Sequence, residues 1–110
     1  MKNPAIFTTR TTLNEYSKGL EFVSNGDGTC TVSGIGTCTD TDIKIPSVYN
    51  GEKVTSIGRF AFSHRTFLTR VVIPNSVTII GKSAFVGCTS LNSLTVLNSV
   101  TSIGIQALER

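Results

Sequence analysis

Apolar and polar positions return in the same order every 23 residues through the second half of the chain. The motif Val-Thr-Ser-Ile-Gly at residues 54–58 returns as Val-Thr-Ile-Ile-Gly at 77–81 and as Val-Thr-Ser-Ile-Gly at 100–104. A fixed period of about 20–29 residues with spaced aliphatic positions is typical of a solenoid, whose coils cover one another. The pattern therefore predicts a mainly β repeat protein built from stacked coils.

Each repeat predicts two short strands joined by a compact turn. The valine and the isoleucine of the motif point inward from the first strand, and the chain bends at the glycine that follows. An Ala-Phe pair at 61–62 and 84–85, replaced by Ala-Leu at 107–108, is expected in a single helical or 3-10 turn. A second strand is expected over residues 69–73 and 92–96.

The register of this pattern determines which side chains should be buried, because a slip of one residue would turn every strand side chain to the opposite face. Thr55, Thr78 and Thr101 are expected to form an outward ladder. The residues predicted to be buried are Ile57, Phe62, Leu68, Val71, Ile73, Ile80, Phe85, Leu91, Leu94 and Val96.

The segment before the repeats predicts a cap. Residues 1–18 are polar and aperiodic, so we expect a flexible tail or lead-in. Residues 19–53 are expected to form an N-terminal β-hairpin cap and an atypical first coil. The hairpin turns at Asn-Gly-Asp-Gly over 25–28, and the first coil carries an insertion that turns at Asn50-Gly51. Residues 54–110 then hold the 23-residue repeats, the last one incomplete.

The stretch 73–91 gives the pattern Ile-Pro-x-Ser-Val-Thr-x-Ile-Gly-x-x-Ala-Phe-x-x-Cys-x-x-Leu. This pattern resembles the BspA-like leucine-rich-repeat family, also called the Treponema pallidum type, and the likeness covers roughly residues 19–110. Two positions depart from this pattern. Arg65 is the equivalent of Cys88 in the preceding repeat, and Leu97 is the equivalent of Pro74 in the following one. The resemblance implies a leucine-rich-repeat solenoid and a surface protein that adheres to host or neighbouring-cell proteins, with no catalytic residues.

The composition suits strands and tight turns, and it narrows the function. Charged residues make up 15% of the chain, whereas Thr and Ser number 16 and 12. The net charge is +3 with scattered Lys and Arg, so no nucleic-acid partner is expected. No apolar run is long enough for membrane insertion, and the first residues lack the apolar region of a signal peptide. A secreted or cell-surface location is favoured, with a cytoplasmic one as the alternative.

Three cysteines and one histidine are the candidates for thiol or metal chemistry. Cys88 lies in the repeat and is expected to be a reduced, buried thiol. Cys30 and Cys38 both fall in the cap and are either free or paired. His64 is expected to be a solvated loop residue beside Arg65 rather than the base of a thiol nucleophile. Because no Cys-x-x-Cys occurs, neither a zinc site nor another cofactor is expected.

Two acidic fragments, Asn25-x-Asp27 and Asp40-x-Asp42, resemble parts of calcium loops. Neither has a glutamate downstream at the spacing that calcium loops use, and turn chemistry explains both. No carboxylate pair, catalytic triad or phosphate loop appears, so no enzymatic activity is expected.

Basic and aromatic side chains leave further alternatives open. The cations Arg59, Arg65, Arg70 and Lys82 form either a solvated face or a basic patch for an acidic partner or glycan. Arg70 aligns with Asp42 of the neighbouring coil, which favours a cross-strand ion pair. Phe7 and Tyr16 in the lead-in either pack back over the cap or anchor a partner.

The outward face of the second strands is the candidate binding face. Its residues are Lys44, Arg70, Val72, Ser93 and Thr95. The leading hypothesis is a non-catalytic protein-binding or cell-surface adhesion module, with an extracellular-matrix or host surface protein as its partner. The alternative is a structural N-terminal capping segment of a longer array.

The repeat pattern stops midway through a coil at residues 107–110. The strand that should follow is absent, so apolar side chains of the last coil are expected to lack a covering coil. Either the chain is a fragment of a longer array, or it forms a homodimer through the open C-terminal end, residues 91–108.

Overall fold

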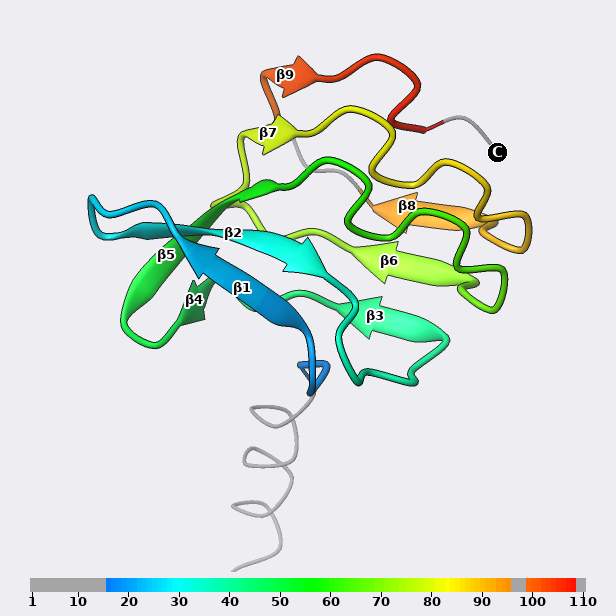
Figure 1. Ribbon diagram of the computed structural model, residues 1–110, viewed down its shortest axis with the longest axis horizontal. Helices are drawn as coiled ribbons and strands as arrows, with labels where there is room; N and C mark the ends of the chain where they lie inside the picture. The colour runs from blue at the N-terminus through cyan, green and yellow to red at the C-terminus, as the bar shows by residue number, and fades with distance from the viewer. Residues whose placement is uncertain (1–15, 96–98, 109–110) are drawn as a thin grey trace, which may run out of the picture.

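The chain winds between two β-sheets that enclose one apolar core (Figure 1). The computed structural model describes residues 16–95 and 99–108. Sheet A has the order β1-β2-β5-β7-β9, with β4 also paired to β5, and sheet B has the order β3-β6-β8. The strands are β1 (Glu21–Ser24), β2 (Thr29–Gly34), β3 (Asp42–Lys44), β4 (Val48–Tyr49), β5 (Glu52–Ile57), β6 (Arg70–Val72), β7 (Ile79–Ile80), β8 (Ser93–Thr95) and β9 (Ser102–Ile103). The predicted mainly β solenoid is confirmed.

Equivalent residues of successive coils are direct neighbours in both sheets. In sheet A, β5, β7 and β9 are parallel, and the register places Ile57 beside Ile80 and Ile80 beside Ile103. In sheet B, β3, β6 and β8 are parallel, and Val71 pairs with Leu94. The 23-residue period of the sequence is therefore the length of one coil.

The core is a set of columns that run along the stack of coils. Phe62 and Phe85 form one column, with ring centroids 5.3 Å apart and an interplanar angle of 7°. Of the residues predicted to be buried, Leu94 is half-buried against the core and Val96 lies outside the described residues. All the others are buried: Ile57, Phe62, Leu68, Val71, Ile73, Ile80, Phe85 and Leu91.

The outward threonine ladder is confirmed. Thr78 and Thr101 are exposed and Thr55 is half-buried. The Thr78 hydroxyl donates to the Thr55 carbonyl at 3.4 Å, and the Thr101 hydroxyl donates to the Thr78 carbonyl at 3.3 Å. Each hydroxyl therefore adds to the backbone bond between coils at the same position.

The prediction of a helical or 3-10 turn around the Ala-Phe pair was wrong. Residues 16–95 and 99–108 contain no helix, and hence none that could cross a membrane. Phe60 and Ser83 have φ values of 57° and 56°, which interrupt any right-handed helical run. The turn also uses its amides between coils, since the Phe62 N–H donates to the Ala84 carbonyl at 2.8 Å. A helix would have consumed these amides internally.

The bends at Gly81 and Gly104 require glycine because the coils touch there through their backbones. A Cβ atom on Gly81 would lie 2.8 Å from both the Arg59 nitrogen and the Gly58 carbonyl carbon. Gly104 lies against Gly81 in the same way, with its Cβ position 2.8 Å from the Gly81 carbonyl carbon. This glycine column sets the spacing of the stack.

The N-terminal cap contains the predicted hairpin and a second hairpin at the predicted Asn50-Gly51 turn. β1 and β2 pair antiparallel, as do β4 and β5. Asn50 and Gly51 have φ values of 51° and 78°, the combination that a type I′ hairpin turn requires. The Phe22 and Tyr49 rings stack with centroids 4.0 Å apart, which joins the two hairpins.

The opposite end of the stack exposes apolar side chains of the last coil. Ile103 lies in the inward row of sheet A but is 51% exposed, and Ile105 is 73% exposed. Val100 is half-buried and Leu108 is exposed. The sequence predicted this lack of cover for Val100, Ile103 and Leu108. It is observed for Ile103 and Leu108, whereas Val100 packs against the core.

Candidate binding surfaces

Sheet B brings the predicted binding face together in two cross-strand rows. Asp42, Arg70 and Ser93 form one row, and Lys44, Val72 and Thr95 form the other. The five predicted residues are therefore register neighbours, and Asp42 is a sixth member of the face. Val72 and Ser93 are half-buried, and Arg70 is exposed.

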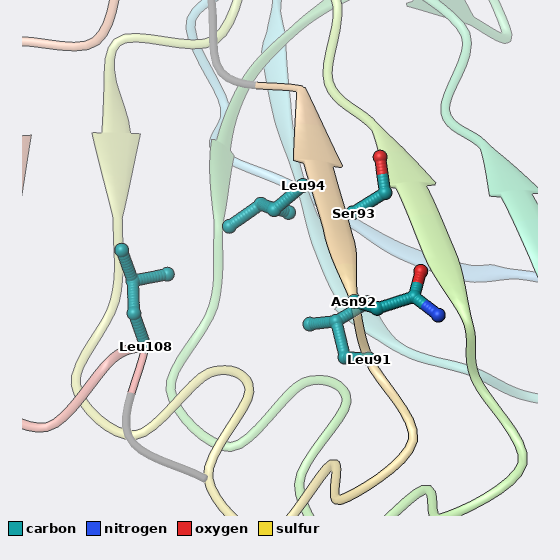
Figure 2. Close-up of a pocket in the computed structure, with 5 residues that line it drawn as sticks. All are labelled: Leu91, Asn92, Ser93, Leu94 and Leu108. Carbon is teal, nitrogen blue, oxygen red and sulfur yellow. The ribbon is translucent and has the colours of Figure 1, made fainter.

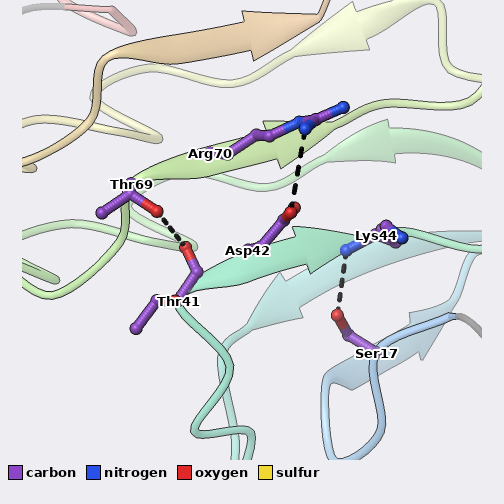
Figure 3. Close-up of polar contacts among 6 residues, drawn as sticks. All are labelled: Ser17, Thr41, Asp42, Lys44, Thr69 and Arg70. Atoms are coloured by element: carbon purple, nitrogen blue, oxygen red, sulfur yellow. Dashed lines mark hydrogen bonds and ion pairs between the residues drawn. The ribbon is translucent and has the colours of Figure 1, made fainter.

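The ion pair predicted between Arg70 and Asp42 is present (Figure 3). The Arg70 Nη1 atom lies 3.9 Å from the Asp42 Oδ2 atom, and both side chains are about half exposed, at 52% and 42%. At such exposure the pair contributes only about 0.2–1 kcal/mol to stability. Its effect on the face is to neutralise the charge of Arg70.

Residue Ser17 closes the free edge of β3, which the sequence did not predict. The Lys44 N–H donates to the Ser17 hydroxyl at 2.9 Å (Figure 3). The Ser17 N–H donates in turn to the Lys44 carbonyl, also at 2.9 Å. On the other side, the Thr69 N–H donates to the Thr41 carbonyl at 2.8 Å. One side chain and one amide thus replace a missing strand, a role that carries no sequence signal.

A small groove lies between β8 and the end of the last coil (Figure 2). It has a volume of about 200 Å³ and is lined by Leu91, Asn92, Ser93, Leu94 and Leu108. Small-molecule pockets usually measure about 300–1,000 Å³ and include convergent polar groups. The groove is better described as an incompletely covered part of the core.

The three cysteines are free and buried, so Cys30 and Cys38 are not paired. The Cys88 thiol donates to the Phe62 carbonyl at 2.9 Å, which places it in the core as predicted. Burial raises the pKa of the Cys88 thiol, and burial together with the charge of Glu52 raises the pKa of the Cys30 thiol. Both shifts oppose thiolate formation, so neither site favours nucleophilic chemistry.

His64 is exposed in the turn region, as predicted, and has a φ value of 58°. Its ring lies directly over Gly87, the equivalent residue of the next coil, where a Cβ atom would collide with it. A side chain at position 87 would therefore displace the ring. His64 has a packing role that the sequence did not reveal.

The first acidic fragment forms a turn network at the tip of the β1–β2 hairpin. The Thr29 N–H and hydroxyl both donate to Asp27 Oδ1, and these bonds lower the pKa of the Asp27 carboxyl. Asn25 Nδ2 donates to the Thr29 hydroxyl at 2.9 Å. In the second fragment, Asp42 faces Arg70. Within the described ranges, no three His, Cys, Asp or Glu residues gather as metal ligands.

The fold of stacked coils resembles that of known proteins. A family model described as "BspA type Leucine rich repeat region (6 copies)" matches residues 29–110. No curated protein sequence matches the chain.

Several solved structures resemble the fold. A T. pallidum leucine-rich-repeat protein has a TM-score of 0.70 and 26% identity, and the match covers 78% of this chain and 40% of that one. A leucine-rich cell-surface protein of Faecalibacterium prausnitzii has a TM-score of 0.72 and 35% identity, covering 82% and 26%.

A leucine-rich-repeat protein of Bacteroides capillosus has a TM-score of 0.70 and 30% identity, and the match covers 81% of this chain and 71% of that one. The chain thus spans less than half of the first two proteins. Together with the repeat geometry, these matches show that the chain belongs to the BspA-type leucine-rich-repeat family.

Proposed function

We propose that the chain is a protein-binding module that acts through the outward face of sheet B. The observation that carries this proposal is the arrangement of Lys44, Arg70, Val72, Ser93 and Thr95 in adjacent strands of one parallel sheet. The Ser17 bonds occupy the backbone edge at β3, so recognition depends on side chains rather than on an added strand there. Aliphatic, hydroxyl and guanidinium groups together suit a protein surface.

We further propose that this module works at a cell surface and adheres to an extracellular-matrix or host surface protein. One of the similar structures is named as a cell-surface protein of Faecalibacterium prausnitzii. The hydroxyl-rich, charge-poor composition also supports an extracellular setting.

The test is binding of immobilised protein to a panel of purified extracellular-matrix proteins, measured by biolayer interferometry. Val72→Asp should weaken binding at least about tenfold, because a carboxylate would be desolvated at the centre of the face. Thr78→Asp is the matched control on sheet A and should leave affinity unchanged. No binding to any panel member, or equal loss in both variants, would contradict the proposal.

A second proposal is that the chain acts as the N-terminal cap of a repeat array. The bonds from Ser17 to Lys44 and the stacked Phe22 and Tyr49 rings support it, because they cover the first coil. Ser17→Ala should then lower the melting temperature of the protein without changing matrix binding. An unchanged melting temperature would argue against the capping role.

We also propose self-association through the last coil. The exposed Ile103, Ile105 and Leu108 side chains support this interface. Sedimentation velocity of residues 1–110 should show a concentration-dependent dimer that Ile103→Lys abolishes. A monomer at all concentrations would contradict it.

A further inference from the structure

The charges of this protein are divided along the chain. Residues 53–108 contain five Lys or Arg residues and no Asp or Glu. Residues 16–52 contain five Asp or Glu residues and two lysines. The stacked coils are therefore uniformly positive, whereas the carboxylates of the described region lie in the cap.

Two cations of the coils stand in one column. Arg59 and Lys82 are equivalent residues of adjacent coils, and the Phe60 N–H donates to the Lys82 carbonyl at 3.1 Å. Among the residues that the structure describes, neither forms an ion pair, whereas Arg70 faces Asp42. The bond from Phe60 to Lys82 holds the two backbones in contact, and like charges at neighbouring positions disfavour each other. An external carboxylate would relieve that repulsion.

Two large apolar side chains are exposed in the same two coils as Arg59 and Lys82. Phe60 is 48% exposed, and the Arg59 guanidinium carbon lies 5.9 Å from its ring centroid. Ile79 is 47% exposed on the outward side of β7. The coils of both residues are covered on either side, so their exposure is unrelated to the end of the stack.

The conformation of Phe60 is a second unusual feature. Its φ of 57° lies in the left-handed region, which bulky side chains rarely adopt. The equivalent positions hold Ser83 and Gln106, also with positive φ. Phe60 is therefore the one aromatic residue among three equivalent turn positions, and it points into solvent at an energetic cost. Such strain at an exposed position is a reason to look for a binding role.

We propose that Arg59, Phe60, Ile79 and Lys82 form a docking strip for an acidic, amphipathic segment of a protein partner. Carboxylates of the segment would bind between Arg59 and Lys82, and its apolar side chains would cover Phe60 and Ile79. Arginine and aromatic residues are the side chains most enriched at protein interfaces. A sulfated glycan would use the two cations but leave Ile79 uncovered, so a polypeptide fits better. The inference rests on the proposed function in one respect: the docking strip and the face of sheet B would both bind protein partners.

The test uses a fluorescent synthetic peptide in which glutamate alternates with leucine, with fluorescence polarisation as the readout. The same peptide with glutamine in place of glutamate tests the charge, and heparin tests the glycan alternative. Arg59→Glu combined with Lys82→Glu should weaken peptide binding at least about tenfold. Lys18→Glu combined with Lys53→Glu makes the same change in net charge at exposed positions away from the strip and should leave affinity within about twofold.

Phe60→Ser should weaken binding without loss of fold, because the next coil already has serine at this position. Val72→Asp should bind the peptide normally, which separates this strip from the matrix-binding face of sheet B. Equal loss in the two double variants, equal binding of the glutamine peptide, or binding of heparin alone would overturn the proposal. So would the absence of peptide binding.

Discussion

The two stacked phenylalanines, Phe62 and Phe85, are the largest side chains of the core, and both are almost completely buried. We predict that Phe85→Ala lowers the free energy of unfolding by about 3–5 kcal/mol, through lost burial and the cavity that remains. The corresponding drop in melting temperature is on the order of 10 °C or more. Thermal melts followed by circular dichroism will measure it.

Phe67→Ala is the matched control, because Phe67 is exposed. We expect it to change stability by less than about 1 kcal/mol. Similar losses in the two variants would mean that the register of the coils is wrong.

The Cys88 thiol gives a prediction about pH. Burial raises its pKa in the fold, so the folded protein keeps a proton that the unfolded chain releases above the ordinary thiol pKa. Stability should therefore fall as pH rises from about 8 to about 10. The difference in unfolding free energy between wild type and Cys88→Ala should shrink over this range in urea titrations. If the difference between the two proteins stays constant or grows with pH, the Cys88 thiol does not have a raised pKa in the fold.

At the residue scale, the repeat made burial predictable. A residue that recurs at the same place in successive coils occupies a column, and the columns of Ile57 and Phe62 follow directly from the sequence. The contacts of Ser17 and His64 and the conformation of Phe60 were not predicted. Their roles depend on contacts between segments that the repeat does not relate, or on one residue that differs from its equivalents.

At the scale of elements, the glycine column limits how closely the coils stack. We predict that Gly81→Ala destabilises the protein by about 1–3 kcal/mol, because its methyl group would lie 2.8 Å from the Arg59 nitrogen and the Gly58 carbonyl carbon. Thr78→Ala in the same coil is the control, since Thr78 is exposed. Urea unfolding will compare the stabilities of the two variants. A Gly81→Ala variant as stable as wild type would contradict the close backbone contact at Gly81.

The strands and hairpins were predictable because alternation and Asn-Gly turns act locally. The turn after each glycine was not, since a compact Ala-Phe segment suits a helical turn in isolation. Carbonyl groups of neighbouring coils accept hydrogen bonds from the amides of this segment. These bonds between coils compete with the bonds inside a helical turn, and they form only when the coils stack. The Phe60 N–H to Lys82 carbonyl bond, 3.1 Å long, is one such contact.

For the whole molecule, stability should decrease from the cap toward the last coil. Each coil is stabilised mainly by its neighbours, as in other repeat proteins. Ile57 is fully buried, whereas Ile103 in the same row is exposed. We predict that the Gly104 amide, bonded to the Ile80 carbonyl, exchanges hydrogen faster than the Gly58 amide, bonded to the Val32 carbonyl. Equal protection in NMR exchange experiments would instead indicate one cooperative unit.

The architecture could be predicted from the sequence because a repeat multiplies every weak local signal. The residues of the candidate face on sheet B could be predicted in the same way, because the repeat aligns equivalent residues of β3, β6 and β8. Its partner is not encoded in periodicity, because solvent-facing positions are free to vary without disturbing the stack. That freedom is what allows Phe60 to differ from its equivalents, Ser83 and Gln106.

The absence of carboxylates from residues 53–108 also determines how the protein responds to acid. Acid unfolding arises mostly from carboxylates that are bonded in the fold and must take up protons. Residues 53–108 contain no carboxylate that could take up a proton, and the one histidine is exposed. Asp27 in the cap has a lowered pKa, so its contribution is present at neutral pH and is lost only as pH falls below about 4. We predict nearly equal melting temperatures at about pH 7 and about pH 5, with exchange at still lower pH starting in β1 and β2. A large drop in melting temperature already at pH 5 would contradict this prediction. A melting temperature that is unchanged at pH 5 would suit the module to acidic surroundings.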